Sequence, residues 1–288
     1  MKLARFGPAG AEVPAVLHDG VWRDARPALS VRAEFGGDFG PAFFAHGGVD
    51  LVATQVDSLP ELSTQGLRRG APIGRPGAVI CVGMNYAAHA AESGALPPEQ
   101  PVIFLKLPNT VVGPDDDVAI PRGSTKTDWE VELGIVIGAT TTYLDSPEES
   151  LARIAGFVAV NDVSERDFQL AVSGGQWSKG KCCAGFSPTG PWLVTPDEIE
   201  HQNLTLRSWV NGDERQNSST ADMVFDVATI VHHLSQYLVL EPGDLILTGT
   251  PEGVALSGRF PYLAVGDLCE IEIEGLGRAR QHFVTGAS

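Results

Sequence analysis

Short apolar runs rich in β-branched residues recur through most of the chain after residue 76, and glycine, proline or polar residues bound each of them. Runs of this length and composition predict β-strands. The predicted strands cover residues 79–82, 102–105, 118–120, 131–137, 157–160, 204–210, 245–247 and 268–273. One stretch differs, because apolar residues recur at helical spacing within 226–240 and predict a single long helix. This pattern predicts a mainly β, α+β protein, built as a folded sandwich or barrel-like roll.

The first 75 residues carry a weaker pattern. Apolar residues lie on both sides of Asp19-Gly20, a dipeptide typical of a two-residue β-hairpin turn. Glycine pairs follow, without a cluster of reactive side chains, as far as Pro76. We therefore expect a small β-rich N-terminal subdomain with its linker over residues 1–75, and a main domain over 76–288.

Composition and charge exclude several kinds of partner. The chain has 288 residues, 43% of them hydrophobic, and a formal net charge of −16. This acidic balance argues against nucleic acid and anionic membranes as partners. No apolar run approaches the roughly 18 residues of a membrane-spanning helix, and the N-terminus lacks the apolar core of a secretion signal. We expect a cytoplasmic protein.

Cysteine usage agrees with a reducing compartment. The four cysteines are Cys81, Cys182, Cys183 and Cys269, and no C-x-x-C spacing occurs. This arrangement predicts neither a disulfide framework nor a zinc site. We expect buried thiols rather than a catalytic nucleophile.

Three carboxylates carry the strongest chemical signal. Glu130 and Glu132 lie two residues apart at the start of the predicted strand 131–137, and Asp162 follows the predicted strand 157–160. Side chains two apart on a strand project to the same face. Clustered carboxylates repel one another, and a divalent cation such as Mg²⁺, Mn²⁺ or Ca²⁺ relieves that repulsion. The alternative is that Glu130 and Glu132 form the solvent face of an edge strand.

His89 and Glu92 form a candidate acid–base pair. They lie three apart in a segment, 86–93, that predicts a short helical turn, so they would be neighbours on one face. A carboxylate bound to an imidazole fixes its tautomer and suits it to act as a general base on water. Gly94 and the following prolines indicate a flap. A solvated surface pair is the alternative.

Further polar residues suit substrate binding. Arg166 and Gln169 follow Asp162 and could bind a carboxylate and a carbonyl. Lys181 lies beside glycine and could stabilise an enolate or form a Schiff base. Thr250 lies in a glycine-rich turn whose hydroxyl and N–H groups could hold a small anion. A salt-bridged surface arginine, a solvated lysine and a plain tight turn are the respective alternatives.

Taken in order, these segments resemble the fumarylacetoacetate hydrolase family. The matching stretches are residues 81–92, 126–134, 161–166, 176–181, 190–192 and 248–251, so the resemblance spans roughly residues 76–284. It implies a mixed β-sandwich roll that is usually dimeric and uses Mg²⁺ or Mn²⁺. It also implies site roles: Glu130, Glu132 and Asp162 as metal ligands, His89 and Glu92 as the water-activating dyad of a lid, and Arg166, Gln169, Lys181 and Thr250 on the substrate side.

One departure from the family pattern follows Lys181. Family members often carry Gly-Lys-Ser-x-Asp, whereas Cys182 and Ala184 occupy the serine and aspartate positions here. If that aspartate orients the lysine, we expect Lys181 to be less constrained in this chain.

The resemblance implies a metal-dependent hydrolase that cleaves a C–C bond in a 2,4-diketo acid and releases pyruvate. The substrate would be an acylpyruvate or a 2,4-diketo-3-deoxy sugar acid, a small anion, and the protein would be a homodimer. The same site would also suit an oxaloacetate decarboxylase, a 2-oxo-dienoate isomerase or hydratase, or a ureidoglycolate lyase. A non-catalytic metal-binding homologue is the remaining alternative.

Overall fold

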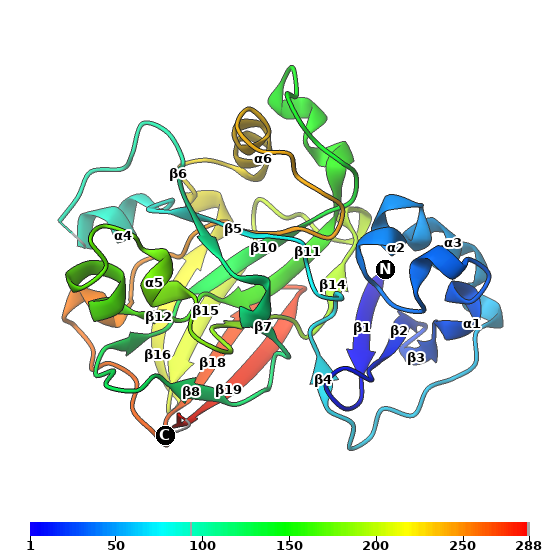
Figure 1. Cartoon of the computed structure of the whole chain (residues 1–288), viewed down its shortest axis with the longest axis horizontal. Coiled ribbons are helices and arrows are strands. Elements are labelled where there is room, and N and C mark those ends of the chain that lie inside the picture. The colour runs from blue at the N-terminus through cyan, green and yellow to red at the C-terminus, as the bar shows by residue number, and fades with distance from the viewer. Residues whose placement is uncertain (93, 287–288) are drawn as a thin grey trace.

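Two β-sheets pack face to face in the computed structural model, which describes residues 1–92 and 94–286 (Figure 1). Within these residues the larger sheet has ten strands and the smaller has five. The larger runs in the order β3 (Val21–Asp24), β2 (Val13–His18), β1 (Lys2–Phe6), β14 (Leu193–Val194), β11 (Ile154–Asn161), β10 (Val131–Ile137), β17 (Leu245–Leu247), β5 (Val79–Gly83) and β6 (Val102–Lys106), with β4 (Arg69–Gly70) beside β1. The smaller runs β16 (Asp213–Ser219), β15 (Thr205–Val210), β18 (Leu268–Ile273), β19 (Gly277–Thr285) and β8 (Val118–Ile120).

Short strand pairs and helices complete the fold. β9 (Thr127–Asp128) pairs with β12 (Ser164–Glu165), and β7 (Val111–Val112) pairs with β13 (Ser187–Pro188). The α-helices are α1 (Arg26–Leu29), α2 (Pro41–Ala45), α3 (Gly48–Gln55), α4 (Ala87–Glu92), α5 (Ser178–Lys181) and α6 (Val227–Ser235), and a π-helical turn covers Asp167–Ala171. None of the helices in the described part of the chain is long and apolar enough to span a membrane.

Strand β10 shows how the core positions the acidic residues. Val131, Leu133 and Ile135 are fully buried in the main core cluster, together with residues of α6 and of the smaller sheet. The alternate positions of a strand face the other way. Glu132 therefore projects from the opposite face of the larger sheet, into a cavity that residues of α4 and α5 also line. Both helices lie at the left of Figure 1.

Each predicted strand overlaps an observed one, and the predicted sheet-rich α+β class is confirmed. The predicted helix 226–240 was too long, because α6 ends at Ser235. Beyond it the chain turns, and Leu240 forms a β-bridge with Thr141 instead of continuing the helix. The predicted helical turn 86–93 corresponds to α4, and its residue 93 lies outside the described residues, as do the predicted main domain's last two, 287 and 288.

The N-terminal segment contains both the predicted hairpin and unpredicted helices. β2 and β3 pair around Asp19-Gly20, as expected. Helices α1, α2 and α3 then occupy much of residues 26–55, so the β-rich part is confined mainly to the first 24 residues. β1 also pairs with β14 of the main domain, so the N-terminal strands extend the larger sheet. The division of the chain at residue 75 stays a prediction.

Candidate functional site

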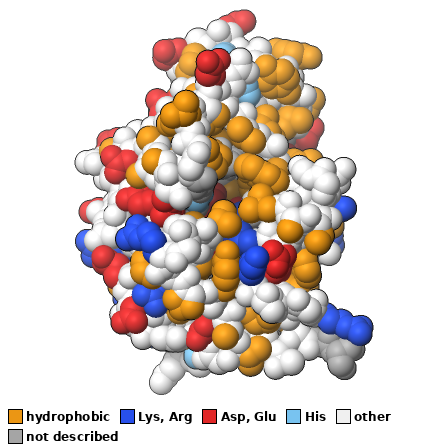
Figure 2. Space-filling view, turned by 90° about the vertical axis from the view of Figure 1, so that its left-hand side faces the viewer, with side chains coloured by type: hydrophobic (Ala, Val, Ile, Leu, Met, Phe, Trp, Pro, Cys, Tyr) orange, Lys and Arg blue, Asp and Glu red, His pale blue; other side chains and the backbone are white. Residues whose placement is uncertain are grey.

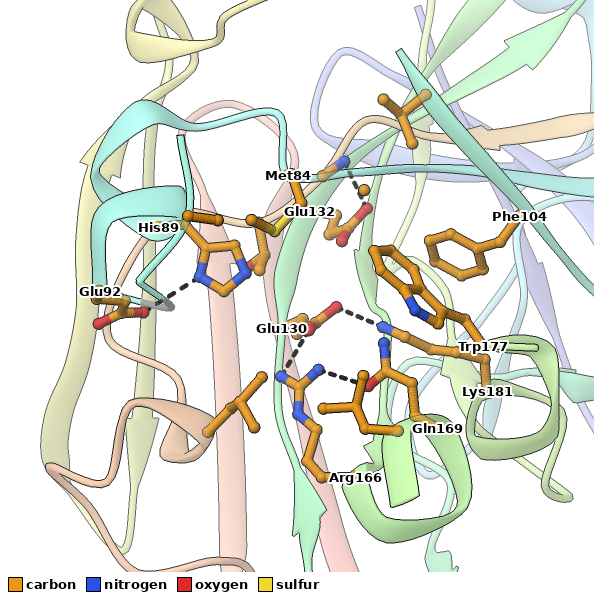
Figure 3. Close-up of a pocket in the computed structure, with 17 residues that line it drawn as sticks. Met84, His89, Glu92, Phe104, Glu130, Glu132, Arg166, Gln169, Trp177 and Lys181 are labelled. Carbon is orange, nitrogen blue, oxygen red and sulfur yellow. Dashed lines mark hydrogen bonds and ion pairs between the residues drawn. The ribbon is translucent and has the colours of Figure 1, made fainter. Parts of the chain in front are cut away.

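A pocket of about 350 Å³ opens beside β5 and β6, the strands at one edge of the larger sheet. Its lining comes from β5, β6, β10, α4, α5, the π-helical turn and the loop that follows β17. Figure 2 shows this side of the molecule, where hydrophobic side chains surround a hollow near the centre. Figure 3 shows the interior, in which acidic and basic side chains converge at the middle of the pocket.

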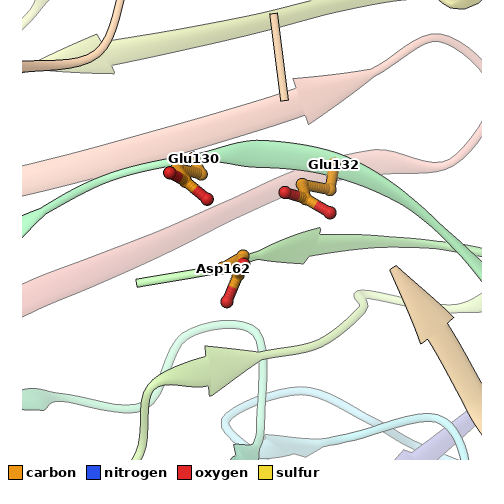
Figure 4. A group of neighbouring side chains, drawn as sticks. All are labelled: Glu130, Glu132 and Asp162. Atoms are coloured by element: carbon orange, nitrogen blue, oxygen red, sulfur yellow. The ribbon is translucent and has the colours of Figure 1, made fainter. Parts of the chain in front are cut away.

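The three predicted metal ligands lie together. One carboxylate oxygen from each of Glu130, Glu132 and Asp162 lies within 4.8 Å of the others, and all three residues are buried (Figure 4). The register explains the cluster, because Glu132 lies opposite Val160 in the β10–β11 pair and Asp162 follows two residues later. Same-face neighbours on adjacent strands are brought together in this way. The edge-strand alternative is excluded, since β10 lies inside the larger sheet.

Glu132 is the carboxylate of this cluster that lacks a cationic partner. Within the described residues it forms no ion pair within 4 Å, and its Oε2 accepts a hydrogen bond from the Gly249 N–H at 2.8 Å. Burial, together with the charges of Asp162 and Glu130, raises the pKa of Glu132 well above its usual value. A buried carboxylate with this deficit of positive charge fits a divalent cation bound by hard oxygen ligands.

Glu130 has the opposite environment. Its Oε2 lies 2.6 Å from Lys181 Nζ, and its Oε1 lies 2.6 Å from Arg166 Nη2. Burial opposes ionisation, but these two cations outweigh it and lower the pKa of Glu130 far below its usual value. Glu130 is therefore a fixed anion.

Lys181 is firmly held, contrary to the expectation drawn from Cys182 and Ala184. Its Nζ also lies 2.6 Å from Asp162 Oδ2, and the residue is only 1% exposed. Burial opposes its charge, but Asp162 and Glu130 overcome that effect and raise the pKa of Lys181. The lysine therefore needs no aspartate at position 184 to fix it, and it is not set up as a neutral amine for Schiff-base chemistry.

The predicted dyad is formed. His89 Nδ1 lies 3.1 Å from Glu92 Oε1, and both residues line the pocket on the side of α4. Glu92 also accepts a hydrogen bond from the Gly253 N–H at 3.0 Å. The surface-pair alternative is excluded, because both side chains are at most 10% exposed.

The glycine-rich turn after β17 binds protein carboxylates through its N–H groups. Gly249 donates to Glu132 and Gly253 donates to Glu92. Gly249 has a φ of +96°, and a Cβ there would come within 2.8 Å of Asn85 Cβ, so glycine is required. The turn therefore connects the carboxylate cluster with the dyad, and these two N–H groups are not available to a small anion.

The predicted substrate-side residues line the pocket but already have protein partners. Arg166 Nε donates to Asp128 Oδ2 at 2.8 Å, and its Nη1 donates to Gln169 Oε1 at 2.9 Å. The Thr250 hydroxyl donates to the Val131 carbonyl at 2.9 Å. Their roles in binding substrate stay predictions.

Comparison with known proteins decides the family. The family model described as "Fumarylacetoacetate (FAA) hydrolase C-terminal" matches residues 78–284. The chain belongs to the fumarylacetoacetate hydrolase family. This confirms the resemblance drawn from the six sequence segments.

Relatives of this family member span its full length. A 2,4-didehydro-3-deoxy-L-rhamnonate hydrolase from Sphingomonas sp. strain SKA58 is 43% identical, covering 98% of this chain and 95% of that one. Fumarylacetoacetate hydrolase from Exiguobacterium antarcticum superposes with a TM-score of 0.83 at 33% identity, covering 99% of this chain and 100% of the other. Maleylpyruvate hydrolase from Sphingobium sp. SYK-6, solved with manganese(II) and pyruvate, gives a TM-score of 0.79 at 26% identity, with both chains fully covered. These matches support an enzyme, a hydrolase or lyase of acyl or keto acids.

Two buried charged residues of this hydrolase-family site were not predicted from the sequence. Lys106, at the end of β6, donates to Asp162 Oδ1 and, at 2.6 Å, to the Phe186 carbonyl. Asp128 accepts hydrogen bonds from Arg166 and from the Ala255 N–H, the latter at 2.9 Å. The sequence did offer a signal, because each of these charged residues lies next to an apolar segment. A charged residue that is buried in such a place usually has a partner of opposite charge.

Proposed function

We propose that this chain is a divalent-metal-dependent hydrolase that cleaves a C–C bond in a 2,4-diketo acid and releases pyruvate. The substrate is an acylpyruvate or a 2,4-diketo-3-deoxy sugar acid. The observation that carries the proposal is the buried, unpaired Glu132 carboxylate within a group of three, in the same pocket as the His89–Glu92 dyad. The names of the rhamnonate-derived hydrolase relative and of the manganese–pyruvate complex support the same reaction class.

Glu130, Glu132 and Asp162 would hold Mg²⁺ or Mn²⁺, since three hard carboxylate oxygens suit these ions, and Ca²⁺ is the next candidate. Such an ion, when bound, supplies a Lewis acid and a template for the adjacent carboxylate and keto oxygens of a 2-oxo acid. The cluster is shielded from bulk water, which strengthens its electrostatic interaction with a bound anion.

The dyad performs the proton transfers. Glu92 accepts the His89 Nδ1–H, which leaves His89 Nε2 as the basic nitrogen. Nε2 removes a proton from water as the oxygen attacks the C4 carbonyl of the diketo acid. The C3–C4 bond then breaks, its electron pair forms the enolate of pyruvate, and the acyl group leaves as a carboxylic acid. The imidazolium returns its proton to C3, so one water is consumed and the dyad is restored.

Lys181 stabilises the negative charge of the departing enolate. Its raised pKa keeps it an ammonium ion, and burial makes its electrostatic contribution larger than it would be in water. A decarboxylase or an isomerase would also need this cation, but neither would need a water-activating dyad. The dyad therefore favours hydrolysis over decarboxylation and isomerisation.

A substrate panel tests the proposal. It contains acylpyruvates, a 2,4-diketo-3-deoxy sugar acid, oxaloacetate and ureidoglycolate, each assayed with Mn²⁺, with Mg²⁺ and with EDTA. We expect metal-dependent pyruvate release and loss of diketo absorbance. Turnover of oxaloacetate alone would instead make the protein a decarboxylase, and silence across the panel with metal bound would make it a non-catalytic homologue. The proposed assembly is a homodimer, which light scattering over a range of concentrations tests.

A further inference from the structure

The pocket has two chemically different parts. The charged side chains meet at its centre, whereas much of the remaining wall is apolar. In Figure 3 the rings of Phe104 and Trp177 lie on the other side of the carboxylates from the His89–Glu92 dyad. The apolar wall is formed by Val82, Met84, Phe104, Leu170, Trp177 and Leu256.

The aromatic part of this wall is fixed in place. Phe104 and Trp177 pack edge to face, with ring centroids 5.7 Å apart. A Cβ at position 83 would come within 2.5 Å of Trp177 Cζ3, so the indole rests directly on the Gly83 backbone. Lys181 Nζ lies 5.2 Å from the Phe104 ring centroid, which places the wall next to the charged centre.

The cations of the pocket are already paired with protein carboxylates. Apart from His89, the basic residues in the described lining are Lys181 and Arg166. Lys181 contacts Glu130 and Asp162, and Arg166 contacts Asp128 and Glu130. A bound divalent ion would supply charge for one substrate carboxylate. A second carboxylate, at the far end of a substrate, would find no unpaired cation among the described residues that line the pocket.

We propose that this pocket selects 2-oxo and 2,4-diketo monocarboxylates whose distal end is short, uncharged and largely apolar, with this apolar wall, including Leu170, determining that specificity. The inference rests on the proposed function and narrows its substrate class. An apolar group gains from contact with the wall, because its surface leaves water. A carboxylate in the same position loses hydration without gaining a partner.

Two stable ligands of equal chain length test the selectivity without requiring turnover. 2-Oxohexanoate ends in a methyl group and 2-oxoadipate ends in a carboxylate. Calorimetric titration of the Mn²⁺-loaded protein should show 2-oxohexanoate binding at least about tenfold more tightly, a difference of about 1.4 kcal/mol, because the terminal carboxylate of 2-oxoadipate would lose hydration without gaining a partner. Equal affinity, or tighter binding of 2-oxoadipate, would overturn the inference and leave the proposed hydrolase function standing.

A substitution at the pocket mouth provides a gain-of-function test. Leu170 is 47% exposed on the π-helical turn, so a longer side chain can be accommodated there. Leu170→Arg should tighten 2-oxoadipate binding and reduce the preference for 2-oxohexanoate, whereas the uncharged control Leu170→Gln should leave 2-oxoadipate weak. If the affinity for 2-oxoadipate rises equally in both variants, or rises in neither, the wall does not select against charge.

Turnover provides the third comparison. Butanoylpyruvate should have a higher kcat/KM than succinylpyruvate, whose acyl chain has equal length and a terminal carboxylate. The reverse order would refute the inference alone. If neither 2-oxo acid binds the metal-loaded protein and neither acylpyruvate is hydrolysed, the proposed function fails, and the specificity that rests on it fails as well.

Discussion

Lys181 Nζ lies 2.6 Å from Glu130 Oε2, inside the group of carboxylates that would bind the metal. The same nitrogen lies 2.6 Å from Asp162 Oδ2. In this arrangement the lysine supplies part of the positive charge that the buried carboxylates require. A divalent ion bound by these carboxylates would therefore compete with the ammonium group for two of the same side chains.

This competition predicts the behaviour of Lys181→Met. Without metal, the variant should melt at a lower temperature, since removal of one partner from a buried ion pair costs about 3–5 kcal/mol. Mn²⁺ should then raise its melting temperature more than that of the wild type, because no ammonium opposes the ion, and pyruvate release should be lost. Scanning calorimetry with and without Mn²⁺ measures both effects. Lys179→Met, at an exposed lysine two residues away, is the control. If Mn²⁺ raises the melting temperatures of the wild type and of Lys181→Met by the same amount, the ion and the lysine do not compete.

Glu132→Gln should abolish binding of divalent ions. The amide keeps the size of the side chain and its bond to the Gly249 N–H but removes the negative charge. In EDTA the variant should be at least as stable as the wild type, because it buries no unpaired charge. Titration calorimetry with Mn²⁺ tests the first point and thermal melting the second. Glu149→Gln, at an exposed glutamate, is the matched control, and unchanged Mn²⁺ affinity in Glu132→Gln would remove this residue from the metal site.

His89→Gln should lower hydrolysis by about 10²–10⁴-fold, the usual contribution of a general base. Affinity for Mn²⁺ should be unchanged, because His89 is not in the carboxylate cluster. Steady-state pyruvate release and Mn²⁺ titration on the same preparation separate the two readouts. Hydrolysis at the wild-type rate would place water activation elsewhere, and a parallel loss of Mn²⁺ affinity would point to a damaged site.

The strands could be predicted because their signal is local. Period-two alternation at the start of β10 placed Glu132 and the preceding Glu130 on one face without any knowledge of the neighbouring strands. The proximity of Asp162 depends on the β10–β11 register, a pairing that the chain's local pattern does not contain, so the sequence supported its grouping with the two glutamates only as a hypothesis, which the family resemblance also implied. The pairing of Phe104 with Trp177 is likewise a product of the tertiary fold.

The helices of the N-terminal segment could not be predicted for a related reason. α1, α2 and α3 are short, and glycines interrupt the stretch between them. Their stability comes from packing, since Phe35, Phe39 and Phe43 are buried against one another in the core that continues under the larger sheet. Isolated helices of this length are not stable in water, so local sequence carries little signal for them.

The environment of His201 predicts that the folding stability of the protein depends on pH. Its ring stacks on Phe157, with centroids 4.7 Å apart, and burial lowers its pKa below the ordinary value. The unfolded chain therefore binds a proton more readily than the folded one, so stability falls as the pH falls below about 6.5. Melting temperatures in EDTA between pH 7.5 and 5.5 should decline more in the wild type than in His201→Phe, which keeps an aromatic ring without a titrating group. Parallel profiles would contradict this assignment.

Lys106 contacts one carboxylate of the cluster, that of Asp162, whereas Lys181 contacts two. Its ammonium group also donates to the main-chain carbonyls of Phe186 and Val163. Lys106→Met would leave Asp162 Oδ1 without this donor and free the carboxylate to reorient. We expect Mn²⁺ affinity to fall about 10–100-fold, as for loss of a group that orients a metal ligand. Much of the turnover should return at saturating Mn²⁺, because the three ligands themselves remain. Lys126→Met, at a half-exposed lysine paired with Asp167, should change neither quantity. Unchanged Mn²⁺ affinity in Lys106→Met would show that Asp162 keeps its position without this lysine.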